Sequence, residues 1–495
     1  MLALRSAHKL GPAPLCRWPG RTASYVAGPK SVLVNDVHSR LNETRVDAVR
    51  SPASLAELRE LVRAAARSNR PLAVCGARHA MGGQQFLDDA ILVDTRKLDR
   101  VLHLDAERGT VTVESGCTWP HLLAQYEAMQ MERLGRVCWG FAQKQTGADE
   151  LTIGGAVAAN AHGSGLRMKP LVGDVRSLEL VDDTGAVVTC SREENGDLFR
   201  LVVGGYGLFG IIYAVTFQLA PRQVLRRVVR VIDIENAASA TRRKIAQGFL
   251  YDDFQFDVDG QSPDFLTKGV FSCYVPMGED VAIPASQHVL GPEQWEELLF
   301  LAHVDKRRAF QLYAAHYLGT DGQLYHSDRH QLSTYRDDYH TKIDTRTGAK
   351  VRGSEMISEL YVPHDNVIAF LRRAARRLVG IGAPVIYGTI RLIARDDETF
   401  LPWARQDFAC IVFNLHVDHS LEGIDLAAIA FRALIDEALE LDGSFFLTYH
   451  KFATREQLLR GYPELPAFLA EKERFDRKGL FQSNWYRWLG GLLQQ

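Results

Sequence analysis

The sequence predicts an α+β protein made of two large units, and three observations support this fold class. The chain has 495 residues, a length typical of two or three structural units. Its first 220 residues hold many short alternating apolar runs, some of which pair into hairpin patterns, with few helical patterns between them. After Pro221, strand patterns continue, mixed with loops and helices.

The first unit begins near Ser31, and its first clear element is a helix. Ser54 and Glu57 have the spacing of a capping box, with Ser54 at the N-cap position, and apolar residues then recur at helical spacing over residues 55–65. The other elements expected in this unit are strands at 71–75 and 91–93, a hairpin of 101–104 with 110–114, a helix at 119–131, and a hairpin of 177–181 with 186–190.

The second unit is expected over residues 221–450. It follows a basic N-terminal extension at 1–30 and the first unit at 31–220, and it precedes a polar and aromatic C-terminal segment at 451–495. Its expected elements are a helix at 295–318, a strand starting at 359, a helix at 366–378, strands at 385–393 and 411–417, and a helix at 424–441.

Composition excludes several classes of function. The formal net charge is −2, and no basic stripe with interleaved aromatics occurs, so we expect no nucleic-acid partner. No apolar run approaches the roughly 20 residues that span a bilayer, so we expect no integral membrane segment. The seven cysteines are scattered without a CxxC pair or a metal-like Cys/His spacing, which indicates a reducing compartment and predicts no metal site.

The first 30 residues hold five basic residues, and the first acidic residue is Asp36. Two interpretations stay open. Either the protein is cytoplasmic and this segment is an N-terminal extension without a targeting role, or the segment is an organelle transit peptide that directs mitochondrial import.

The stretch GARHAMGG at residues 76–83 follows the expected strand at 71–75. Its glycines permit positive φ angles and a close approach of the backbone to a ligand. His79, a strong nucleophile, lies in its centre. The stretch is either a plain turn or a cofactor loop.

Three further stretches are rich in glycine or small residues. Residues 151–165 are dense in Gly and Ala, which suits either a flat ligand or a tight helix–sheet contact. Residues 114–119 form a strand-to-helix turn in which Thr118 is a hydroxyl donor or only part of a helix cap. Gly205, Gly207 and Gly210 spell GxGxxG, but the alternating β-branched residues 211–217 predict a strand where a nicotinamide dinucleotide fold needs a helix.

Taken together, these stretches resemble the FAD-binding domain of the vanillyl-alcohol oxidase superfamily, the PCMH-type fold. Residues 76–79 resemble the GxxH loop of alditol and aldonolactone oxidases, and residues 161–165 resemble their THGSG stretch. The resemblance covers most of residues 40–220 and implies two FAD-binding subdomains, an α+β cap domain with an antiparallel sheet, and a C-terminal segment that returns to the FAD site.

The resemblance implies a set of cofactor-binding residues. Backbone amides from Arg78 to Gly83 would cradle the pyrophosphate, and His79 would either carry the flavin covalently or line the site. The implied residues are Gly76, Ala77, Arg78, His79, Ala80, Met81, Gly82, Gly83, Gln84, Thr118, Gly147, Thr152, Gly154, Gly155, Ala158, Asn160, Ala161, His162, Gly163, Gly210, Ile211, Ile212 and Lys451.

The resemblance also suggests catalytic residues in the cap. Arg391 matches the arginine of the family's Glu-x-Arg strand, but Thr389 replaces the carboxylate, which puts polyol specificity in doubt. Lys451 is placed like the family's lysine beside the flavin N1 and O2 region, where a cation stabilises the reduced anion. Tyr387 and His416 are acid/base candidates.

The implied activity is that of an FAD-dependent oxidoreductase. It would oxidise a CH–OH group of a polyol, aldonolactone or related small molecule by hydride transfer to flavin N5, with O2 or another compound as the electron acceptor. One alternative is a dehydrogenase of a lipid-linked sugar or hydroxy acid that uses an acceptor other than O2. Another is a flavin-binding protein without catalytic activity.

Overall fold

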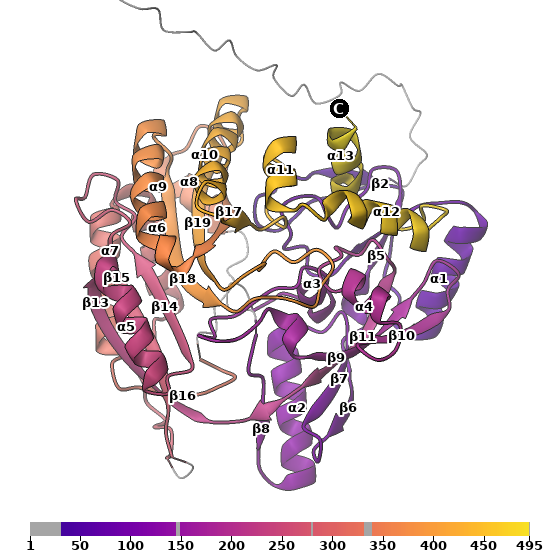
Figure 1. Cartoon of the computed structure of the whole chain (residues 1–495), viewed down its shortest axis with the longest axis horizontal. Coiled ribbons are helices and arrows are strands. Elements are labelled where there is room, and N and C mark those ends of the chain that lie inside the picture. Colours follow the sequence, from indigo (N-terminus) through magenta and orange to yellow (C-terminus); the bar gives the residue numbers. More distant parts are fainter. Residues whose placement is uncertain (1–30, 145–148, 279–280, 331–338, 495) are drawn as a thin grey trace, which may run out of the picture.

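The computed structural model describes residues 31–144, 149–278, 281–330 and 339–494. The predicted α+β class is confirmed, because the sheets are mostly antiparallel and the helices are distributed around them. Figure 1 shows the two units side by side, with the C-terminal helices lying above the first unit. No helix within the described ranges has the length and apolar character needed to cross a membrane.

The first unit starts with a small parallel sheet of order β3-β5-β4. The predicted helix is α1 (Leu55–Arg67), and Ser54 caps it by accepting a hydrogen bond from the Glu57 amide at 3.3 Å. The Glu57 carboxylate accepts from the amide of Ala53 and not from that of Ser54. The second hydrogen bond of the capping box is therefore made to the residue before the N-cap. The strands are β1 (Val32–Val34), β2 (Thr44–Val46), β3 (Ala48–Arg50), β4 (Leu72–Cys75) and β5 (Ile91–Asp94).

A five-stranded antiparallel sheet of order β10-β9-β11-β7-β6 completes this unit. Both predicted hairpins are confirmed as β6 with β7 and β9 with β10. The predicted strand after Gly210 is also confirmed, since β11 starts there and no helix follows the glycines. The elements are β6 (Val101–Asp105), β7 (Thr110–Glu114), α2 (Trp119–Leu134), β8 (Trp139–Gly140), α3 (Ile153–Ala158), β9 (Val175–Val181), β10 (Val187–Ser191), α4 (Gly196–Val202), β11 (Ile211–Gln218) and β12 (Ala220–Pro221).

The second unit is built on an eight-stranded antiparallel sheet of order β16-β13-β15-β14-β18-β19-β17-β20. The strands predicted at 385–393 and 411–417 lie in β18 and β19, and the strand predicted from 359 lies in β17. The strands are β13 (Val224–Asp233), β14 (Tyr251–Phe256), β15 (Lys268–Pro276), β16 (Leu324–His326), β17 (Gly353–Pro363), β18 (Val385–Ile393), β19 (Phe408–Asp418) and β20 (Ser444–Phe445).

One helix prediction in this unit is wrong. The single helix expected at 295–318 is two helices, because Asp305 ends the first and caps the second by accepting from the amide of Arg308 at 3.1 Å. The helices predicted near 366–378 and 424–441 are confirmed. The helices are α5 (Ile234–Ala246), α6 (Pro292–Val304), α7 (Lys306–Gly319), α8 (Tyr339–Thr347), α9 (Val367–Ile381) and α10 (Leu421–Leu439).

The two faces of the large sheet have opposite character. Leu360, Ile411 and Phe413 are fully buried on one face, and α9 and α10, which Figure 1 shows side by side, pack there. Because side chains alternate along a strand, neighbours such as Glu359 and Arg391 project from the other face. That polar face meets the first unit and carries the candidate site.

The C-terminal segment returns to the first unit. It holds α11 (Arg455–Gly461), α12 (Leu465–Phe475) and α13 (Asn484–Leu493). The Leu72 amide donates to the Leu480 carbonyl at 2.7 Å, and the Asn484 amide donates to the Phe86 carbonyl at 2.7 Å. These bonds hold both ends of the segment that contains the GARHAMGG loop.

Candidate active site

The glycine-rich stretches of the first unit converge on the N-terminus of α3. A Cβ atom at Gly76 would lie 2.0 Å from Thr152 Oγ1, so only glycine fits against this helix. The Gly154 amide donates to the Ser115 carbonyl at 2.7 Å, and Thr118 forms a β-bridge with Thr152. Segments far apart in the sequence are therefore joined at one place, as a cofactor site requires.

The GARHAMGG loop is tied to the segment just before α11. The amides of Met81 and Gly82 both donate to the Thr448 carbonyl, at 3.1 and 3.0 Å. These two amides are therefore engaged by the protein, which corrects the expectation that the whole run from Arg78 to Gly83 cradles a pyrophosphate. Lys451 lies beside this loop, because a Cβ atom on Gly83 would be 3.3 Å from its Nζ atom.

His79 is enclosed at the centre of the loop. Only 8% of its surface is exposed, and its Nδ1 atom is 2.8 Å from Nε2 of His38. Burial, with the adjacent His38, lowers the pKa of His79 to about 3. A neutral imidazole keeps a nitrogen lone pair, which is the form needed for nucleophilic attack.

The small-residue stretch after α3 has two roles. Gly155 is exposed and Ala158 half-buried, so together they leave a flat surface of small side chains. Asn160 is buried instead, with its Nδ2 atom donating to Asp396 at 2.9 Å and its Oδ1 atom accepting from the amide of Val172 at 3.0 Å. Because both groups have protein partners, Asn160 positions the site and is not supported as a direct cofactor contact.

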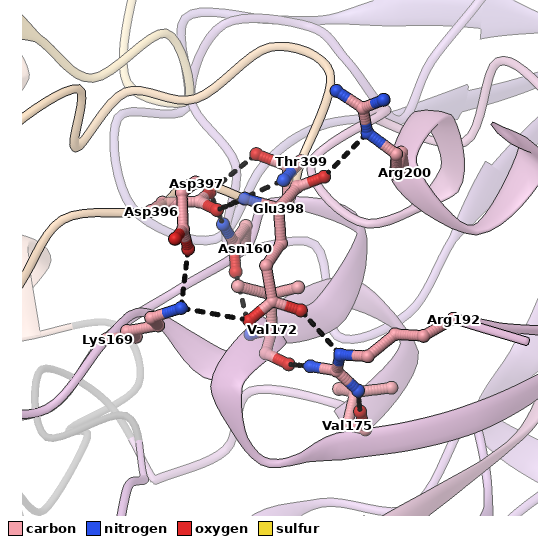
Figure 2. A network of polar contacts seen from close by, with 10 residues as sticks. All are labelled: Asn160, Lys169, Val172, Val175, Arg192, Arg200, Asp396, Asp397, Glu398 and Thr399. Carbon is pink, nitrogen blue, oxygen red and sulfur yellow. Dashed lines mark hydrogen bonds and ion pairs between the residues drawn. The ribbon is translucent and has the colours of Figure 1, made fainter. Parts of the chain in front are cut away.

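Asp396 belongs to the loop between β18 and β19, which rests on the first unit. Glu398 accepts from Arg192 Nε at 2.6 Å and from Lys169 Nζ at 3.2 Å. Its carbonyl accepts from Arg200 Nε at 2.9 Å. Figure 2 shows how these loop residues face the first unit, so the polar network fixes the second unit against the end of α3.

A buried carboxylate lies where the two units meet. Glu359 on β17 is 3% exposed and faces His162 Nε2 at 3.1 Å. The hydroxyls of Tyr449 and Tyr361 donate to it at 2.7 and 2.9 Å, and Cys410 Sγ lies 3.7 Å away. The hydrogen bonds and charge of these partners outweigh burial and lower the pKa of Glu359 to about 2. The carboxylate therefore stays charged at neutral pH.

Glu359 lies in the same row of the sheet as Thr389. Thr389 pairs with Val412 on β19, and Val412 pairs with Glu359 on β17, so the three side chains share one row on the polar face. Two strand spacings separate the outer members, about 10 Å. Arg391 lies in the next row, which it shares with Cys410.

Two cationic side chains near this centre each have a buried nitrogen without a hydrogen bond to any described residue. Nε of Arg391 and Nζ of Lys144 have no hydrogen-bond partner among the residues that the structure describes. Burial lowers the pKa of Lys144 to about 8; Asp149 and Asp328 raise it, and the nearby Arg391 cation lowers it. Unpaired buried cations are costly in free energy, which indicates that an anionic or polar ligand belongs here.

The structure separates some of the other predicted residues from this centre. His416 lies six residues beyond Cys410 on β19, about 20 Å along the strand, so it does not share a reaction centre with Arg391. Tyr387 lies on β18 within the influence of the Arg391 charge, and burial raises its pKa. Ile211 and Ile212 are buried and pair with β9, which engages their backbone in the sheet. Gly147 lies outside the described residues.

Comparison with known proteins identifies the cofactor domain. Residues 46–191 match the FAD binding domain family. They form an FAD-binding domain. The glycine contacts around Thr152 and the flat surface at Gly155 fit a bound dinucleotide. The cofactor of this chain is therefore FAD.

The relatives of the chain include oxidases and dehydrogenases. It is 25% identical to L-gulono-1,4-lactone dehydrogenase of Mycobacterium tuberculosis (strain ATCC 25618 / H37Rv), over 89% of this chain and 95% of that protein. It is 29% identical to mouse L-gulonolactone oxidase over 34% of this chain and 37% of the oxidase. It is 34% identical to cytokinin dehydrogenase 7 of Oryza sativa subsp. japonica, over 37% of this chain and 35% of that protein. The last two matches thus span about a third of each relative's length.

Sequence patterns missed two residues of this site. Glu359 carried a usable signal, because it is an acidic residue inside the apolar run that forms β17. Lys144, within the FAD-binding domain, carried none, because its closeness to Arg391 of the second unit depends on how the two units meet.

Proposed function

We propose that the protein is an FAD-dependent oxidoreductase that oxidises a CH–OH group. The observation that carries this proposal is the buried polar centre, where His162 of the FAD-binding domain meets Glu359, with Arg391 and Tyr449 beside it. The three-stranded and five-stranded sheets would be the two halves of the FAD-binding domain, and the second unit would be its cap.

Each side chain of this polar centre has a separate role in such a reaction. FAD, when bound, supplies the hydride acceptor at flavin N5. Lys144 accepts the hydroxyl proton, because a buried amine with a pKa near 8 is matched to this task. Arg391 stabilises the negative charge that develops on the substrate oxygen. Glu359 is too acidic to be an effective base and instead orients His162 and Tyr449.

His79 is proposed as the attachment point of the flavin. Its neutral ring and its central place in the loop support a covalent bond, and a lining role is the alternative. Lys451 contacts the same loop, so we assign it to cofactor binding rather than to proton transfer. Precipitating the purified protein with acid distinguishes the two roles of His79, since only covalent flavin stays in the pellet.

The proposed substrates are aldonolactones, polyols and related hydroxylated compounds. Two relatives named for L-gulono-lactones support the lactone class. A dehydrogenase that uses an acceptor other than O2, and acts on a lipid-linked sugar or hydroxy acid, is the second candidate, because Thr389 departs from the expected carboxylate. For location we propose the cytoplasm, with mitochondrial import as the alternative.

The test is an anaerobic titration of the purified holoenzyme. L-gulono-1,4-lactone, L-galactono-1,4-lactone, polyols and hydroxy acids are added in turn while the oxidised flavin band is followed. Bleaching by one class identifies the substrate, and reoxidation by O2 or by a dye identifies the acceptor. Bound flavin that no CH–OH compound reduces would refute the proposed reaction, and absence of flavin even after FAD is added would refute the cofactor.

A further inference from the structure

A second polar cluster lies at the far end of the same sheet, away from Arg391. Glu355 on β17 is paired directly with His416 on β19, and His303 from α6 and His340 from α8 complete the group. The Glu355 carboxylate is 2.8 Å from His303 Nε2 and 2.7 Å from His340 Nδ1. His416 Nδ1 lies 3.6 Å from it. Three imidazoles thus surround one buried carboxylate.

Two of these rings have an acceptor on the nitrogen that points away from Glu355. His303 Nδ1 is 2.7 Å from the carbonyl oxygen of Leu299, and His416 Nε2 is 3.3 Å from Oδ1 of Asp418. A neutral ring that donates its proton to such an acceptor has its lone pair on the near nitrogen. Metal-bound histidines have this arrangement, with the second nitrogen held by a carbonyl or carboxylate.

The near nitrogens are not explained by hydrogen bonds alone. His340 is 5% exposed, and its Nδ1 atom approaches Glu355 at 2.7 Å but makes no hydrogen bond of acceptable geometry within the described part of the chain. Nδ1 of His416 is 3.6 Å from Glu355, beyond hydrogen-bond distance, and is also without a hydrogen bond among these residues. One carboxylate can balance the charge of one imidazolium. Glu355 cannot balance three, and its Oε2 atom also accepts from the hydroxyl of Tyr339.

We propose that His303, His340, His416 and Glu355 bind one divalent transition-metal ion of the zinc type. Neutral imidazole nitrogens with one carboxylate oxygen suit such an ion. Ligand atoms about 2.0 Å from a tetrahedral ion lie about 3.3 Å from one another. The ligand atoms of His303, His416 and Glu355 all lie within 4.8 Å of one another, and His340 Nδ1 lies 2.7 Å from the same carboxylate.

The site would have a structural role. Four protein ligands fill a tetrahedral shell and leave no position for a substrate. The ion would fasten α6 and α8 to β17 and β19 at the end of the polar face. Sequence spacing could not predict it, because the ligands come from four separate elements. The site is independent of the proposed oxidoreductase activity.

Metal analysis of the holoenzyme tests the proposal. The protein is produced with zinc in the medium, desalted and analysed for bound metals, and we expect roughly one equivalent of zinc per chain. His303→Ala, His340→Ala and Glu355→Gln should reduce this content to background. The matched control is His288→Ala, which removes an exposed histidine of the same unit and should retain the metal.

Cobalt gives a second measurement that does not depend on how stable the variants are. Protein produced with cobalt should show the ligand-field bands of tetrahedral Co²⁺ at wavelengths beyond flavin absorption. Dialysis against a chelator should lower the thermal midpoint of the wild-type chain and leave that of His303→Ala unchanged. Absence of bound metal and of cobalt bands in the wild type, or metal retained in all three variants, would overturn the proposal.

Discussion

Lys144 provides the sharpest test of the proposed chemistry. Burial lowers its pKa from 10.5 to about 8. If its neutral amine is the base, about 10% of the enzyme is competent at pH 7, about 50% at pH 8 and about 90% at pH 9. The rate of flavin reduction by substrate should therefore rise about fivefold from pH 7 to pH 8, and less than twofold from pH 8 to pH 9.

Two substitutions distinguish the proton-accepting role of Lys144 from the effect of its positive charge. Lys144→Met removes both, and we expect flavin reduction to slow by about 10²- to 10⁴-fold and to lose its dependence on pH near 8. Lys144→Arg keeps a cation that does not deprotonate, so it should also be slow and independent of pH in this range. Lys169→Met, which removes a partly exposed lysine of the interdomain network, is the control and should keep the wild-type profile.

The assay is anaerobic stopped-flow measurement of flavin reduction at saturating substrate. This signal reports only the reduction of the flavin by substrate and does not depend on the electron acceptor. A Lys144→Met enzyme with a wild-type rate, or a Lys144→Arg enzyme that retains the rise near pH 8, would refute the assignment of Lys144 as the base.

Four further substitutions test other parts of the structure. Gly76→Ala places a Cβ atom 2.0 Å from Thr152 Oγ1, so overpacking of about 1–3 kcal/mol should lower the flavin-to-protein absorbance ratio; full flavin content would contradict the packing. Glu359→Gln leaves at least one of three buried donors without an acceptor, which should cost about 1–3 kcal/mol in a urea titration, and an unchanged midpoint would argue against the cluster. Asp396→Ala removes the acceptor for Asn160 and for two amides of its own loop, so limited proteolysis should cleave this loop faster than in the wild type; equal rates would speak against its clamping role. Burial raises the pKa of Asp252 to about 8, so its stabilising contribution is full below pH 4 and is lost as pH rises through 8. The free energy of unfolding of the wild type relative to Asp252→Asn should therefore fall by roughly 4 kcal/mol from pH 4 to pH 7, and a constant difference would refute the raised pKa.

Most secondary structure followed from local patterns. The strand after Gly210 was predictable because residues 211–217 are β-branched or aromatic and alternate, and β11 runs over Ile211–Gln218. The break between α6 and α7 was not, because apolar spacing continues across it. Asp305 ends one helix and caps the next, but a single capping residue inside a continuous helical pattern does not by itself predict a break.

The candidate site was predictable only in part. Gly76 and Gly154 are needed because a Cβ atom at either position would collide with a neighbouring side chain, and a required glycine can be recognised in a sequence. His416 was misplaced because a histidine in a strand carries no information about which end of the sheet is catalytic. Its neighbours there are Glu355 and His303, on β17 and α6.

The sequence by itself determined the α+β class, the FAD-binding stretches and the absence of a helix after Gly210, because glycine positions and side-chain alternation act over a few residues. Only the tertiary structure decided that Glu359 lies in the same row of the sheet as Thr389, and that Lys144 comes close to Arg391. The physical reason is that strand order and the contact between the two units set these distances. Both depend on pairing across the whole sheet, which no local spacing encodes.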